Sequence, residues 1–267
     1  MPVPLHDIVR FFDDTLHTAQ IKDYPHALNG LQVENRGGVT RIAMAVDASE
    51  SAIRAAIEAK ADLLLVHHGL FWGGLQPVTR ATYQKLALCI EHHLAVYSSH
   101  LPLDIHPIYG NNAILAKKCE LSIIGDGIPM GGNILGYRCL CDVPLNNFLH
   151  TLQAVTDMEV RAYLSPEANE LNSLAPLGEI MICSGGAGDE LPVVGTMGIK
   201  TFLTGEGSHW TIPMARELGI NLIYAGHYAT ETFGVTALGQ AASERFSLPA
   251  EFIHDEPKAV VISPLLP

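Results

Sequence analysis

Leu63–Gly69 (LLLVHHG) is the most informative stretch of this sequence. Its apolar residues run without polar alternation, which is typical of a strand buried on both faces of a parallel sheet. Arg41–Asp47 (RIAMAVD) has the same character, and apolar residues at helical spacing in between predict a helix at about Ser49–Ala61. Strands of this kind, separated by helices, predict parallel sheets covered on both faces.

The same alternation continues along the chain. Further strands are predicted at Leu94–Ser98, Thr201–Thr204 and Leu222–Ala225. Further helices are predicted at Tyr83–His93, Asn111–Cys119, Thr211–Leu218 and Glu231–Phe246. Between them, Leu135–Val143 alternates like an antiparallel strand, and Ser165–Leu177 is polar with two prolines, as in a loop or edge. The glycine-rich segment near Gly125–Gly132 suggests a boundary. We therefore expect an α/β fold of two α/β/α-layered halves with mostly parallel sheets, residues 1–126 and 127–267.

Composition excludes several classes of protein. Of 267 residues, 48% are hydrophobic and 16% are charged, which is ample for a buried core. The formal net charge is −12 and no cluster of five or more Lys and Arg occurs, so we do not expect a nucleic-acid partner. No apolar stretch of about 18 residues appears, so we expect no membrane span. Met1–Thr15 includes Asp13 and Asp14 and lacks the pattern of a signal peptide.

Cysteine usage points to a reducing compartment. The chain has five cysteines, an odd number, and no C-x-x-C motif. A cytoplasmic location fits this pattern best. We expect ordinary packing for Cys139 and Cys141, which would share one face of a strand.

Polar residues gather where predicted strands end. Four strands run from apolar to small residues and then to histidine or acid: LLLVHHG at Leu63–Gly69, AVYSSHLPLD at Ala95–Asp104, TFLTGEGSH at Thr201–His209 and LIYAGHYATE at Leu222–Glu231. Open α/β sheets bind ligands outside the carboxyl ends of their strands. We therefore expect a site at the strand ends, between the two halves.

Each of these groups has an ordinary explanation as well as a functional one. His67 and His68 could serve two nearby ions, or be one buried and one exposed histidine. His227 and Glu231 stand four residues apart, as helical metal ligands do. Glu231 could equally be an acid favoured by the dipole in the first turn of its predicted helix.

The remaining polar candidates lie in short strand-end loops. His100, Asp104 and His106 lie in SHLPLDIHP, where prolines would stiffen a ligand platform, or simply form a turn. Glu206 follows another strand end and could be a general base or an acid that supports a neighbouring ligand.

Taken together, the strand-end histidines and carboxylates favour an open metal site. Five side chains cannot fill two tetrahedral shells, which need about eight positions, so a bridging carboxylate and solvent must supply the rest. Such a site is catalytic in type, and its nitrogen and oxygen donors suit Zn, Fe, Mn or Co. SGGAG at Ser184–Gly188 follows an apolar run and could hold a phosphate, although it lacks the third glycine of a dinucleotide fingerprint. Neither G-x-x-x-x-G-K-[ST] nor G-x-S-x-G occurs.

The chain resembles the GTP cyclohydrolase I type 2 family, also called the Nif-three-like family. The resemblance rests on NGLQVE at Asn29–Glu34, VHHGLFW at Val66–Trp72, HLPLDIHPIYGNN at His100–Asn112, TGE at Thr204–Glu206 and AGHYATE at Ala225–Glu231. These stretches follow in the expected order over most of the chain. Longer relatives carry an inserted middle domain, for which this chain is too short.

The resemblance implies a dinuclear metal site and a ring-shaped homohexamer, a trimer of dimers. The family's ligand positions fall on His67, His68, Asp104, His227 and Glu231, with Glu231 between the ions and Asp104 as a second candidate bridge. His100 and Glu206 match positions close to the site, and we expect one of them to shuttle protons in catalysis. His209 does not match a ligand position.

Two functions are expected from this resemblance. The first is a hydrolase of a small nucleotide-like molecule, with GTP as one candidate, because two ions about 3.5–4 Å apart can activate water and polarise a C=N or C=O bond. We further expect bound metal to make the cavity attractive to phosphate. The alternative is a metal-binding ring that acts as a scaffold or regulator without catalysis.

Overall fold

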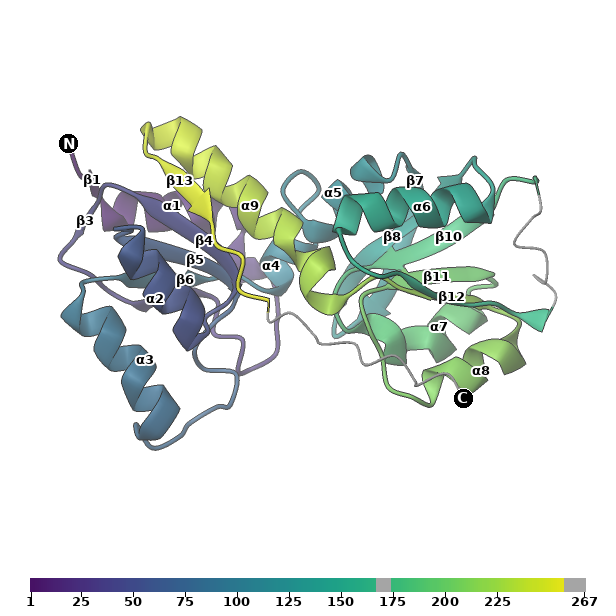
Figure 1. Ribbon diagram of the computed structural model, residues 1–267, viewed down its shortest axis with the longest axis horizontal. Coiled ribbons are helices and arrows are strands. Elements are labelled where there is room, and N and C mark those ends of the chain that lie inside the picture. The colour runs from purple at the N-terminus through teal and green to yellow at the C-terminus, as the bar shows by residue number, and fades with distance from the viewer. Residues whose placement is uncertain (167–173, 257–267) are drawn as a thin grey trace, which may run out of the picture.

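The computed structural model describes residues 1–166 and 174–256, which form two lobes (Figure 1). Each lobe is a β-sheet with helices on both faces, so the predicted α/β/α layering is confirmed. No helix in the described part of the chain is long and apolar enough to cross a membrane. All five cysteines are buried and unpaired.

The first lobe is built on a five-stranded sheet in the order β13-β4-β5-β6-β2. Its strands are β13 (Ala250–Phe252), β4 (Ile42–Asp47), β5 (Leu63–His68), β6 (Ala95–Ser98) and β2 (Gly30–Val33). The first four are parallel and only β2 is antiparallel. The covering helices are α1 (Leu5–Leu16), α2 (Glu50–Glu58), α3 (Arg80–Glu91) and α9 (His227–Phe246).

Alternate residues of these strands enter two different apolar cores. Met44 and Leu65 pack with α1 and α9, whereas Ala45 and Val66 pack with α2 and α3. Both faces are covered, which explains the continuous apolar runs in the sequence. Full burial of a side chain such as Leu65 contributes about 1.5–3 kcal/mol to folding. A short antiparallel pair, β1 (Val3–Pro4) and β3 (Gly38–Val39), and a 3-10 turn at Thr18–Gln20 complete this lobe.

The second lobe has a six-stranded mixed sheet in the order β7-β8-β10-β11-β12-β9. Its strands are β7 (Ser122–Met130), β8 (Asn133–Cys141), β9 (Arg161–Tyr163), β10 (Gly178–Cys183), β11 (Thr201–Thr204) and β12 (Asn221–Tyr224). Only β10, β11 and β12 run parallel to one another. The antiparallel β7–β8 hairpin confirms the alternation seen in Leu135–Val143.

Helices cover both faces of this second sheet. Two of them, α5 (Asn111–Lys118) and α6 (Leu145–Thr156), pack on one face. On the other face lie α7 (Leu191–Thr196), which follows a 3-10 turn at Ala187–Glu190, and α8 (Thr211–Leu218). Within the predicted loop at Ser165–Leu177, residues 167–173 lie outside the described part of the chain.

The sheets divide the chain elsewhere than at the predicted boundary between residues 126 and 127. The second sheet already begins at Ser122, and the C-terminal α9 and β13 return to the first lobe (Figure 1). In Figure 1, α9 runs from between the lobes to the first lobe, so its N-terminal turn lies at their junction. Helix α9 returns to the first lobe because its apolar residues Val235, Leu238 and Ala242 are buried against β4 and β5.

Two local predictions were wrong. Residues Leu101–Asp104, predicted as a loop stiffened by prolines, form a short helix, α4, in which Pro102 occupies the first turn. There the proline is tolerated, because that turn leaves backbone N–H groups without helical partners. Helix α9 begins at His227 and not at Glu231, so Glu231 lies in its second turn. The dipole at the first turn therefore does not account for Glu231.

Candidate metal centre

His67 and His68 end strand β5, and both rings reach the same carboxylate. His67 Nε2 lies 3.5 Å from Glu231 Oε1, and His68 Nε2 lies 3.4 Å from Glu231 Oε2. The two ring centroids are 4.8 Å apart. Although neighbours in a strand point to opposite faces, the rings converge on one carboxylate at the strand end. His67 is completely buried, whereas His68 keeps partial exposure.

Helix α9 presents His227 and Glu231 on one face, one turn apart. His227 Nε2 lies 3.2 Å from Glu231 Oε2. The side chain of Glu231 is only 4% exposed, whereas that of His227 is 34% exposed. The i, i+4 spacing predicted this contact, and the earlier start of the helix makes both residues helical.

Asp104 reaches the centre from the end of α4. Its Oδ2 lies 3.3 Å from His67 Nε2. Its Oδ1 accepts hydrogen bonds from Asn111 Nδ2 at 2.8 Å and from Ser184 Oγ at 3.3 Å. Both hydrogen bonds come from the second lobe, from α5 and from the turn after β10, and the other carboxylate oxygen is left to face His67 of the first lobe.

Every histidine of the centre has its Nδ1 paired, which directs Nε2 inward. The partners are the Ser99 carbonyl for His67, Asp47 for His68, Asp23 for His100 and Glu206 for His227, at 2.8–2.9 Å. Partners of this kind hold metal-binding histidines in the required tautomer and orientation.

Sequence reasoning missed two of these partners, Asp23 and Asp47. Asp47 ends β4 and stands beside His68 in the parallel register, so the strand-end rule could have found it. Nothing in the sequence pattern signals Asp23, which lies outside any helix or strand.

The buried donors fit a cation. His67 Nε2 and Glu231 Oε2 are both buried, yet neither has a hydrogen-bond partner. Leaving such an atom unpaired costs about 1–3 kcal/mol. Donor atoms of His68, His227 and Glu231 lie within 4.8 Å of one another, and so do ring nitrogens of His67, His68 and His100. Bound metal ions would satisfy both orphaned atoms.

The charges of the centre's side chains point the same way. Burial alone would lower the pKa of His67, but Asp104 and Glu231 raise it well above its usual value. Burial likewise opposes the charge on Glu231, but His67 and His227 lower the pKa of that carboxyl. For His227, burial is outweighed by Glu231 and Glu206, which raise its pKa to about 9. The carboxylates thus favour positive charge at the positions that face them, which is the charge a metal ion would supply.

The predicted catalytic residues and the remaining candidates lie in different surroundings. His100 lines the cavity beside the donors, with its ring centroid 4.9 Å from that of His67. Glu206 contacts His227 and its side chain is 64% exposed. His106 is turned to its own loop, where Nδ1 accepts the backbone N–H groups of Ile108 and Tyr109.

The glycine turn Ser184–Gly188 serves the centre in an unexpected way. A side chain on Gly185, whose φ is +70°, would collide with the Glu231 carboxylate. Four of the five backbone N–H groups of the turn are already donated within the protein, to Asn112 Oδ1, Thr230 Oγ1, Thr204 Oγ1 and the Glu206 carbonyl. The turn therefore makes room for Glu231, and it does not form the phosphate cradle that its sequence suggested.

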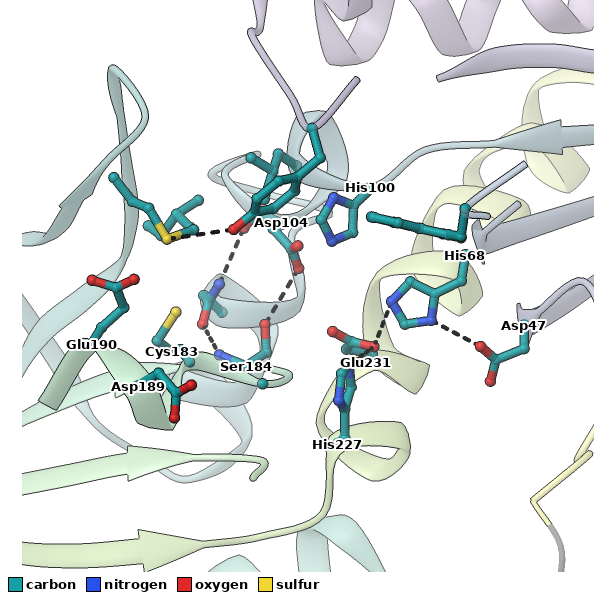
Figure 2. Close-up of a pocket in the computed structure, with 18 residues that line it drawn as sticks. Asp47, His68, His100, Asp104, Cys183, Ser184, Asp189, Glu190, His227 and Glu231 are labelled. Atoms are coloured by element: carbon teal, nitrogen blue, oxygen red, sulfur yellow. Dashed lines mark hydrogen bonds and ion pairs between the residues drawn. The ribbon is translucent and has the colours of Figure 1, made fainter. Parts of the chain in front are cut away.

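A cavity of about 600 Å³ opens beside the donors (Figure 2). Figure 2 shows Glu231 at its inner wall, with His68 and Asp47 on one side and Glu190 on the opposite side. The donors are therefore reachable by a molecule as large as a nucleoside.

Comparison with known proteins gives one consistent family. The model of the family described as Duf34/NIF3 (NGG1p interacting factor 3) matches residues 3–258. A GTP cyclohydrolase 1 type 2 homolog from Pseudomonas aeruginosa is 37% identical over 257 residues, 95% of this chain and 98% of that protein. The homolog from Deinococcus radiodurans is 34% identical, over 93% of this chain and 92% of its own.

Solved structures agree. Protein ybgI, described as of unknown function, superimposes with a TM-score of 0.83 at 30% identity, covering 96% of this chain and 100% of its own. The crystal structure of TTHA1606 from Thermus thermophilus also gives 0.83, at 32% identity, with 97% and 100% covered. The strand-end histidines, the HLPLD segment and the α9 pair are thus features of a chain that belongs to the Duf34/NIF3 family.

Proposed function

We propose that this protein is a dinuclear-metal-dependent hydrolase of a small, nucleotide-like molecule. One observation carries the proposal: His67, His68, His227, Asp104 and Glu231 converge, with unpaired buried atoms, beside an open cavity. A structural metal site is closed by protein ligands, whereas a catalytic one keeps positions open to solvent and substrate.

The two oxygens of Glu231 support two ions. Oε1 faces His67, which also faces Asp104, whereas Oε2 faces His68 and His227. Glu231 would therefore bridge one ion held with His67 and Asp104 and a second held with His68 and His227. Mixed imidazole and carboxylate donors suit Zn, Fe, Mn or Co.

Two residues beside the proposed ligands, His100 and Glu206, would have different roles. Bound divalent ions supply Lewis acidity and an activated water for hydrolysis. His100, backed by Asp23 and exposed to the cavity, would hold and pass a proton at its ring nitrogen. Glu206 would orient His227 instead of contacting substrate, because its carboxylate faces the His227 Nδ1. The relatives' names make GTP, whose imidazole ring opens by addition of water, one substrate to test.

The test is turnover by protein loaded separately with Zn²⁺, Mn²⁺, Fe²⁺ or Co²⁺, against a panel of nucleotides, nucleosides and bases. Asp104→Asn and Glu231→Gln should abolish activity, whereas Glu244→Gln, an exposed glutamate on the same helix α9, should leave it unchanged. Activity that persists in both site variants would contradict the proposal. His100→Ala separates proton transfer from metal binding, because it should reduce turnover while the metal content stays the same.

We also propose a homohexamer, a trimer of dimers, as the resemblance implies. Edge strand β7 and its neighbour β8 expose Ile123, Ile124 and Ile134 at 49%, 47% and 43%, an apolar surface suited to a second copy. The non-catalytic scaffold remains the alternative function, and such a surface favours it equally. Light scattering gives the assembly, and metal-loaded protein that is inert toward the whole panel would favour the scaffold.

A further inference from the structure

The cavity beside the metal centre has several acidic side chains in its lining. Five carboxylates line it, and none of the described residues at its wall is Lys or Arg: Asp47, Asp104, Asp189, Glu190 and Glu231. Two divalent ions would add four positive charges to these five negative ones, so even the loaded wall stays near neutral. A triphosphate would bring about four further negative charges with no cationic side chain to meet them.

Backbone groups do not replace the missing cations. Sites for polyphosphates usually present a row of free N–H groups from a glycine-rich turn or a helix N-terminus. Here the turn Ser184–Gly188 donates four of its five N–H groups to protein acceptors. Only the N–H of Gly186 has no partner within the described protein.

Glu190 gives the far end of the cavity a free acceptor. It is partly buried, and its carboxylate has no hydrogen bond or ion pair with any described residue. Asp189 differs, because it already accepts the backbone N–H and hydroxyl of Ser208. In Figure 2, Glu190 lies across the pocket from His68 and Asp47. A ligand that reaches from the metals to Glu190 would meet a hydrogen-bond acceptor there, and not a donor.

Aromatic side chains complete a wall for a flat ring. Tyr24 and Trp72 line the cavity with their ring centroids 6.3 Å apart, and Trp72 lies edge-on to His100 at 4.8 Å. Tyr24 is 50% exposed, so part of this residue is accessible to a ligand. Such surfaces bind flat, partly apolar molecules.

We propose that this cavity takes an unphosphorylated nitrogen heterocycle whose N–H donors face Glu190, and discriminates against the polyphosphate form of the same compound. The inference rests on the proposed function, because it names the class of molecule that the same cavity would take. It departs from the expectation that bound metal makes the cavity attractive to phosphate.

The experiment is equilibrium binding by calorimetry to Mn²⁺-loaded protein, at one fixed free Mn²⁺ concentration. Guanosine, GMP and GTP share one base, whose ring N–H and amino group suit a carboxylate, and differ in the number of phosphate groups and hence in charge. We expect guanosine to bind at least about tenfold more tightly than GTP, with GMP between them. Tighter binding of GTP than of guanosine would overturn the inference, and so would a failure of guanosine to bind.

Two variants test the role of Glu190. Inosine, which lacks the amino group, should bind wild type about three- to tenfold more weakly than guanosine, and Glu190→Gln should reduce this difference. Glu190→Lys should raise the affinity for GTP. Glu244→Gln is the matched control and should change none of these affinities. An unchanged guanosine-to-inosine ratio in Glu190→Gln would remove Glu190 from the binding site.

Failure of the inference and failure of the proposed function give different results. If guanosine binds but neither it nor any other compound of the panel is hydrolysed, the inference stands and the proposed hydrolase function is contradicted. Hydrolysis of GTP with a lower KM than that for guanosine would support the hydrolase and overturn the inference.

Discussion

His67 and His227 contact the same carboxylate, but they occupy opposite environments. His67, the inner histidine, is fully buried and its second nitrogen is held by a backbone carbonyl. His227, the outer histidine, is 34% exposed and is held by Glu206, itself 64% exposed. The inner histidine is thus fixed by the first sheet, whereas the outer one depends on a solvent-exposed carboxylate. The difference separates a rigid end of the centre from an adjustable end.

The largest effect is expected from removing the group that joins the two ends. Glu231→Gln takes away the charge that both histidines face, so we expect metal affinity to fall by more than about a thousandfold. This loss exceeds the one expected when a residue that only supports a metal ligand is changed. Metal content after dialysis measures this. Retention of both ions by the variant would show that Glu231 is not the bridge.

Chelation should affect the two ends unequally. When free metal is present at about 100 times its Kd, removing it lowers the free energy of unfolding by about 2.7 kcal/mol. For a chain of this size, that loss lowers Tm by about 5–10 °C. Hydrogen exchange should rise in the first turn of α9 around His227, while the β5 amides before His67 stay protected. Equal deprotection of β5 and α9 would contradict the proposed difference.

The pH dependence reports the protons that metal must displace. Because the pKa of His227 in the metal-free protein is raised to about 9, this residue stays protonated at neutral pH. Metal affinity should therefore rise at least about tenfold per pH unit toward pH 9. His227→Gln should show a shallower slope. An affinity independent of pH between about 6.5 and 9 would contradict these charge states.

The raised pKa of His227 also makes the stability of the fold depend on pH. A histidine whose pKa is higher in the folded than in the unfolded protein stabilises the fold below its ordinary value of about 6.5, and that contribution disappears as the pH rises through about 9. Tm of the metal-free protein should accordingly fall over this interval, and the fall should be smaller in His227→Gln. The metal-loaded protein should not show the His227 component of this fall.

The smallest effects are expected from the residues behind the histidines. Asp47→Asn and Glu206→Gln each leave a neutral partner on the Nδ1 of His68 and His227, and we expect losses of metal affinity of about tenfold. Asp47 should matter more, because its histidine is the more buried of the two, 18% against 34% exposed. A larger loss in Glu206→Gln would contradict this ranking by burial.

The side chains that the sequence singled out lie together, but sequence reasoning missed the residues that support them. The strand-end rule and the spacing of His227 and Glu231 brought together the five candidate ligands, which the structure places together beside one cavity. Asp23 escaped, since its contact with His100 joins positions 77 residues apart and no local pattern encodes it. The role of the glycine turn was not predicted, because the space that Gly185 leaves for Glu231 exists only once α9 has packed.

Local sequence by itself determined the layered α/β fold, since continuous apolar strands such as Leu63–Val66 must be covered on both faces. It also determined that histidines and carboxylates stand at strand ends, because the ends of parallel strands share one edge. Tertiary structure alone decided that α9 crosses back to the first lobe, bringing Glu231 between His67 and His227. The reason is physical: which apolar surface a helix covers depends on all the surfaces available, and no window of sequence contains them.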